Sequence, residues 1–227
     1  MIFAVALVIG LVIANMFSFG QSSAKFFDFS FNFKGVKGSG NLASDVRGLS
    51  GFKAIDVGGV FQVEITAQKD FSVEVEADDN LLPFIKTEVR NGVLNIETER
   101  KLSPANPIRI RIAAPDITNL EISGVANVTV NDLKNSEFKL DASGASKIKI
   151  SGETAKLNVD VSGATKIDAE NLKAVDADVK ASGASRVTVN VTGDLLSDAS
   201  GASKILYTGN PANIEKSTRG ASRVSPK

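Results

Sequence analysis

The chain has 227 residues, and its 26 Lys and Arg balance its 26 Asp and Glu, so the formal net charge at pH 7 is zero. It therefore lacks the basic excess that nucleic-acid-binding proteins usually carry. Histidine and cysteine are both absent, which removes the commonest general base, the commonest metal ligand, the thiol nucleophile and any disulfide. We expect no cofactor, no metal site and no nucleic-acid partner.

The N-terminal stretch is uncharged up to Lys25 and begins MIFAVALVIGLVIA. Such a stretch is typical of a secretory signal, and small residues allow cleavage after Gly20 or Ala24. It is also long enough for an uncleaved membrane anchor. Residues 1–24 are predicted to be a signal peptide or N-terminal anchor. In both cases the rest of the chain is exported, to the periplasm, outer membrane or cell surface, with membrane contact only through an uncleaved N-terminal segment.

Residues 25–37 form a phenylalanine-rich segment. Four phenylalanines in KFFDFSFNF alternate with polar residues, which is the period of a strand with one aromatic face. We expect this face to dock on the domain that follows, where it would cover an open edge. The alternatives are docking on a partner protein or on a membrane.

Residues 38–122 contain further strand-like runs, including GFKAIDV, FSVEVEA and GVLNIET. A turn of helix is allowed around Leu81–Ile85, and the alternating IRIRI at 108–112 predicts a strand. GGVFQVEI at 58–65 resembles SGVANVTV at 123–130. We therefore expect this part to consist of irregular versions of the units that follow it.

Residues 123–227 repeat a glycine-centred phrase, as in SGASKI, SGATKI and SGASRV. The intervals between the glycines are 20, 19, 20, 18 and 19 residues, for Gly124, Gly144, Gly163, Gly183, Gly201 and Gly220. Each unit combines short alternating runs with tight turns, which describes one coil of a β-solenoid. The predicted fold class is all-β: a parallel β-helix with coils of about 19 residues and a more irregular N-terminal half.

Equivalent positions of such coils would form ladders about 4.8 Å apart. Glycine is expected at a corner where φ is positive, with the alanine after it on the crowded inside. Those alanines are Ala145, Ala164, Ala184, Ala202 and Ala221. The predicted inward ladders are Ile148, Ile167, Val187, Ile205 and Val224; Ile150, Ala169, Val189 and Tyr207; and Leu140, Val159, Val179 and Leu196.

One position of the unit is always basic. We call this set the basic stripe: Lys147, Lys166, Arg186, Lys204 and Arg223. It is a candidate binding surface for an anionic glycan or a lipid headgroup. The alternative is a solvated face whose charge is balanced by Asp141, Asp160 and Asp198, which lie two residues before the corner serines.

The order of several phrases resembles a known family. They are GSGN at 38–41, ADDNLLPFI, TEVRNGVLNI, PIRIRIAAPDI and the SGA phrases after residue 123. Over about residues 36–225 the chain resembles the putative auto-transporter adhesin, head GIN domain family of bacterial envelopes. The resemblance implies an exported all-β domain of parallel β-helix type over residues 38–227 and supplies no catalytic or ligand motif.

Three functions follow from these observations. The first is a noncatalytic cell-envelope domain, an adhesin-like or surface-interaction module whose partner is a glycan or an envelope protein. The alternative is a structural or regulatory envelope partner protein. The third is a polysaccharide-active enzyme, in which Asp141 and Asp160 would approach the carboxylate separation of about 5 Å of retaining glycosidases. Carboxylates on a flat outer face would not be desolvated, which disfavours the enzyme.

Overall fold

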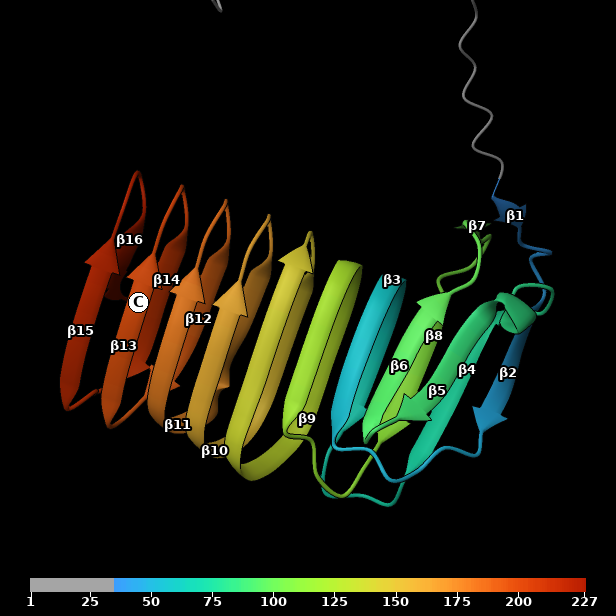
Figure 1. Cartoon of the computed structure of the whole chain (residues 1–227), viewed down its shortest axis with the longest axis horizontal. Helices are drawn as coiled ribbons and strands as arrows, with labels where there is room; N and C mark the ends of the chain where they lie inside the picture. The colour runs from blue at the N-terminus through green and yellow to red at the C-terminus, as the bar shows by residue number, and fades with distance from the viewer. Residues whose placement is uncertain (1–34) are drawn as a thin grey trace, which may run out of the picture. The chain divides into compact units, whose positions relative to one another are not determined.

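The computed structural model describes residues 35–227 (Figure 1). The predicted signal or anchor, and the phenylalanines of the segment at 25–37, lie outside the described residues. Within residues 35–227, no helix is long and apolar enough to cross a membrane. The elements described are strands and a single 3₁₀ turn, so the all-β class is confirmed for this part of the chain.

The first elements run up to residue 113. They are β1 (Val36–Lys37), β2 (Leu42–Arg47), β3 (Ala54–Thr66), β4 (Ser72–Asp78), η1 (Leu82–Phe84), β5 (Ile85–Arg90), β6 (Val93–Thr98), β7 (Leu102–Ser103) and β8 (Arg109–Ala113). The turn η1 and strand β8 confirm the helical turn and the IRIRI strand that the sequence predicts. The short strands β1 and β7 pair with each other in a separate sheet of two strands.

The remaining strands are longer and follow the glycine phrases. They are β9 (Asn119–Gly144), β10 (Lys147–Val161), β11 (Lys166–Ala181), β12 (Arg186–Val191), β13 (Asp194–Ala199), β14 (Lys204–Gly209), β15 (Asn213–Thr218) and β16 (Arg223–Pro226). Figure 1 shows two rows of parallel strands, with β12, β14 and β16 in one row and β13 and β15 in the other. The long strands β9 to β11 continue through both rows.

The parallel register follows the glycine spacing. Ile148 pairs with Ile167, which pairs with Val187, and the ladder continues through Ile205 to Val224. This confirms the first predicted ladder, and its members up to Ile205 are fully buried. The buried side chains of both rows belong to one hydrophobic core.

The third predicted ladder is wrong at its last member. Val179 pairs with Ser197, whose side chain is buried, whereas Leu196 is 44% exposed. Val179 and Ser197 both lie four residues before their glycine, and a shift of one residue moves a strand side chain to the opposite face. The buried Ser197 hydroxyl donates a hydrogen bond to the Glu215 carbonyl at 3.0 Å.

Antiparallel pairs occupy the N-terminal part of the sheet. Strand β4 pairs antiparallel with both β2 and β8, and β5 forms an antiparallel hairpin with β6. The hairpin turn is Asn91–Gly92, with φ values of 51° and 77°. Two consecutive residues with positive φ form the two-residue turns that join antiparallel strands.

The prediction of a parallel β-helix with coils of about 19 residues is therefore wrong. The main sheet has 14 strands and is mixed, because its parallel pairs continue into the antiparallel pairs of β2, β4 and β8. Strand β3 pairs along its whole length with the first half of β9, from Ala54–Asn119 to Thr66–Asn131. This register confirms the relation between residues 58–65 and 123–130, although the segment between them folds differently.

The glycines of the SGA phrases lie in a column. The φ of Gly163 is 79°, and a Cβ on Gly163 would overlap the carbonyl oxygen of Gly144. The alanines after these glycines are exposed, so their predicted inward placement is wrong. The hydroxyl residues that follow the first four alanines lie inside instead, and the fifth, Ser222, is half-buried. For example, the buried Ser146 hydroxyl donates to the Gly124 carbonyl at 3.2 Å, so the hydroxyl finds a hydrogen-bond partner inside the fold.

A buried carboxylate holds together the loops beside this sheet. Asp78 is 0% exposed and accepts hydrogen bonds of 2.7 Å from the Ala105 N–H and from the Asn106 side-chain amide. Burial alone would raise the pKa of Asp78, but the hydrogen bonds from Asn106, Ala105 and Gly40 favour the charged carboxylate more strongly, so the pKa lies below its ordinary value. Asp78 thus anchors the loop between β7 and β8.

We expect Asp78→Asn to destabilise the protein most at neutral pH. A lowered pKa contributes stability above the ordinary aspartate pKa of about 3.9, and that contribution is lost as pH falls through the folded-state value. The difference in free energy of unfolding between wild type and variant should therefore shrink below about pH 4. Urea unfolding from pH 7 to pH 2.5 measures it. The exposed Asp70, as Asp70→Asn, is the control, and a pH-independent difference for Asp78→Asn would contradict the assignment.

Candidate functional site

The structure places the five residues of the basic stripe in one column. Lys147 pairs with Lys166, Lys166 with Arg186, Arg186 with Lys204 and Lys204 with Arg223. Four of the side chains are exposed and Lys204 is half-buried. They project outward because the residue after each of them packs into the core, and successive strand residues point to opposite faces.

The column continues beyond the stripe with side chains that the sequence reasoning missed. Lys147 pairs with Asn127, Asn127 with Gln62, and Gln62 with Arg109. The sequence contains a signal for Gln62 and Asn127, which is their distance from a glycine. They lie three residues after Gly59 and Gly124, and Lys147 lies three residues after Gly144. Arg109 has no such glycine before it, and its position follows from the pairing of β8 with β3.

The cations of the stripe are not neutralised within the described chain. None of the five forms an ion pair with another residue of 35–227. Like charges about 4.8 Å apart repel by about 1 kcal/mol even in a water-like dielectric. The column therefore places five like charges next to one another along one outer face.

The arginines at the other end of this face are neutralised. Arg109 contacts Glu76 at 2.7 Å and Arg111 contacts Glu74 at 3.2 Å. The hydrogen bond that Arg109 donates to Glu76 lowers the pKa of Glu76, and the hydrogen bond that Arg111 donates to Glu74 raises the pKa of Arg111. This end of the face is a set of satisfied cross-strand ion pairs.

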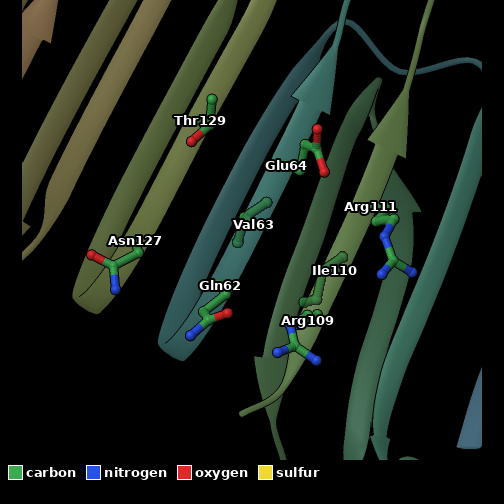
Figure 2. Close-up of a pocket in the computed structure, with 8 residues that line it drawn as sticks. All are labelled: Gln62, Val63, Glu64, Arg109, Ile110, Arg111, Asn127 and Thr129. Atoms are coloured by element: carbon green, nitrogen blue, oxygen red, sulfur yellow. The ribbon is translucent and has the colours of Figure 1, made fainter.

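A shallow depression of about 490 Å³ lies between the ion-paired arginines Arg109 and Arg111 and the start of the basic stripe. Figure 2 shows its polar side chains on three neighbouring strands: Gln62 and Glu64 on β3, Arg109 and Arg111 on β8, and Asn127 and Thr129 on β9. The two amides offer hydrogen-bond donors and acceptors beside the first lysine of the stripe.

The acidic residues proposed to balance the stripe lie on the other row of strands. Asp141 pairs with Asp160 in register, but Asp198 pairs with Lys180. Asp141 forms its ion pair with Lys139 at 2.7 Å, and that hydrogen bond raises the pKa of Lys139. Within the described residues, none of the three aspartates forms an ion pair with the stripe.

The carboxylate pair considered for an enzyme occupies a shallow depression of about 260 Å³ that also contains Lys139 and Lys180. Asp160 is exposed and Asp141 is half-buried, so neither is desolvated as a catalytic acid requires. In residues 35–227, no group of three or more Asp or Glu side chains is placed to hold a metal ion.

Together, the fold and this site define an all-β protein whose candidate binding residues lie on outer faces of a sheet. The model of the family described as "Putative auto-transporter adhesin, head GIN domain" matches residues 51–211, and the chain belongs to this family. The family resemblance inferred from the sequence phrases is thus confirmed. No curated protein matches the chain.

Solved structures share the fold. A putative adhesin from Bacteroides fragilis has a TM-score of 0.67 at 21% identity, over 85% of this chain and 100% of that one. A putative adhesin from Parabacteroides merdae has a TM-score of 0.54 at 18% identity, over 85% of this chain and 98% of that one. These similarities establish a common fold among proteins described as adhesins.

Proposed function

We propose that this protein is an exported, noncatalytic adhesin-like module of the cell envelope, and that the basic stripe is its binding surface for an anionic ligand. Membership of an adhesin family supports the adhesin-like role and an envelope location. The observation that carries the choice of surface is the column of five in-register cations without ion pairs in the described part of the chain.

The charge distribution favours this surface over the rest of the sheet. The other charged ladders mix acids with bases, as where Asp198 pairs with Lys180 or Arg109 with Glu76. An anionic ligand lying along the stripe would relieve the repulsion between its neighbouring cations. On the other row of strands, Asp160 is exposed and Asp141 is half-buried in a shallow depression, which supports a binding role without catalysis.

The test measures binding of the full chain to envelope fractions of its own cell by pull-down at low and raised salt. A variant with Lys147, Lys166, Arg186 and Lys204 changed to serine should bind about tenfold less or worse at low salt. A matched control replaces four exposed lysines elsewhere, Lys69, Lys134, Lys156 and Lys180, with serine and should bind as wild type. Equal losses in the two variants would reject the stripe as the binding surface.

A further inference from the structure

A row of small apolar side chains runs beside the basic stripe. We call this row the corner ridge: Val60, Val125, Ala145, Ala164, Ala184, Ala202 and Ala221. Val60 pairs with Val125, and they are 67% and 53% exposed. Each alanine is exposed and donates its N–H to a glycine carbonyl of the preceding unit at 2.8–2.9 Å, as Ala164 does to Gly144. Their backbones therefore form a continuous, rigid column.

The corner ridge and the basic stripe lie side by side. In each unit the alanine and the cation are separated by one hydroxyl residue, which is buried in the first four units, as Thr165 between Ala164 and Lys166 is 1% exposed. The alanine lies in the turn before the strand and the cation is the first residue of that strand, so the two exposed residues are two positions apart in the chain. The same pair of groups, one apolar and one cationic, thus recurs at the start of β10, β11, β12, β14 and β16.

The corner ridge leads to a small groove at its N-terminal end. This groove has a volume of about 280 Å³ and is lined by Val60, Phe61, Pro104, Pro107 and Lys147, among others. The loop that carries the two prolines is held by the buried Asp78 through the backbone N–H of Ala105. The groove is therefore a fixed feature at one end of the surface.

The corner ridge and the basic stripe together favour one class of anionic ligand. The apolar side chains of the ridge are Val and Ala, which are too short to enter a bilayer as Trp, Phe or Leu do in membrane-binding faces. Neither ridge nor stripe contains an aromatic side chain on which a nucleobase could stack. An acidic sugar offers a carboxylate or sulfate at its rim and an apolar C–H face on its ring, which match the stripe and the ridge. Gln62 and Asn127 offer amides to sugar hydroxyls.

We propose that the corner ridge and the basic stripe together bind a linear acidic polysaccharide lengthwise, with acidic groups on the stripe and ring faces on the ridge. This inference rests on the proposed function and names its ligand class. From Gln62 to Arg223 the column spans six strand spacings, about 29 Å, so the surface accommodates several sugar residues and the groove receives one end of the chain.

The experiment titrates the full chain with oligogalacturonates of two and eight residues by calorimetry at several salt concentrations. The octamer should bind at least about tenfold more tightly than the dimer, because it occupies more of the column. The double variant Ala164→Gln and Ala184→Gln should weaken octamer binding about fivefold with an unchanged salt dependence, because no charge is altered. The stripe variant should instead lose both affinity and salt dependence.

Each outcome separates the two proposals. If the stripe variant binds like wild type, the proposed function fails and this inference fails with it. If the stripe variant loses binding but the ridge variant does not, or if dimer and octamer bind equally, only the lengthwise polysaccharide is rejected. Equal or tighter binding of inorganic polyphosphate, or of phosphatidylglycerol vesicles, would also reject it in favour of a non-saccharide anion.

Discussion

Gly163→Ala is expected to destabilise the protein by about 4 kcal/mol. Two costs add at this position. The φ of 79° is one that side chains with a Cβ rarely adopt, which costs about 1–2 kcal/mol. In addition, the new methyl group would overlap the backbone carbonyl of Gly144. That carbonyl cannot move freely, because it accepts the Ala164 N–H at 2.8 Å, so the strands must separate locally.

Gly51 provides a matched control for the cost of the positive φ alone. Its φ is 78°, and a Cβ there would meet nothing within 4 Å. Gly51→Ala should therefore cost only about 1 kcal/mol. Denaturant unfolding of the two variants and of wild type measures the difference, which is the contribution of the close backbone approach. Equal losses would show that the glycine column is not tightly packed.

Phe138→Ala is expected to cost about 3–5 kcal/mol. Phe138 is 0% exposed and pairs with Leu157, which in turn pairs with the small Ala177. The rigid backbone ladders on both sides prevent the strands from closing the space, so a cavity remains.

The control for this prediction is Val175→Ala. Val175 lies on β11 and is 51% exposed, so its truncation should change the free energy of unfolding by no more than about 0.5 kcal/mol. Thermal or urea unfolding of both variants tests the pair. A loss below about 1.5 kcal/mol for Phe138→Ala would mean that the core repacks around the missing ring.

The parallel register could be predicted from the sequence because the units are nearly constant in length. Counting from each glycine gives the pairing of Lys147 with Lys166 and of Ile148 with Ile167. The antiparallel part has no such period. Its clearest local signal was the dipeptide Asn91–Gly92, which favours a two-residue hairpin turn. The pairing of β2 with β4 joins segments about 30 residues apart in the chain and has no local signal.

The candidate site was predicted in part for the same reason. The members of the basic stripe share one offset from their glycines, so their alignment follows from counting. The inward placement of Ala164 was wrong because size alone was used to choose the inner residue. The hydroxyl of the buried Thr165 finds a backbone acceptor in the corner, the Gly144 carbonyl at 3.4 Å, which also accepts the Ala164 N–H. Leu196 was placed in the ladder because its side chain is apolar like that of Val179. Counting four residues back from Gly201 gives Ser197 instead.

In each unit the alanine and the cation lie one and three residues after the glycine. This fixed spacing determines what the duplication of one unit would do to the surface. Each alanine of an SGA phrase donates its N–H to a glycine carbonyl of the preceding unit, so a duplicated unit would repeat that contact. The duplicate would lengthen the exposed track by one methyl and one positive charge and leave the chemistry of each step unchanged. If the surface binds a polysaccharide lengthwise, as proposed, the number of units in this chain sets how many acidic sugars it can hold.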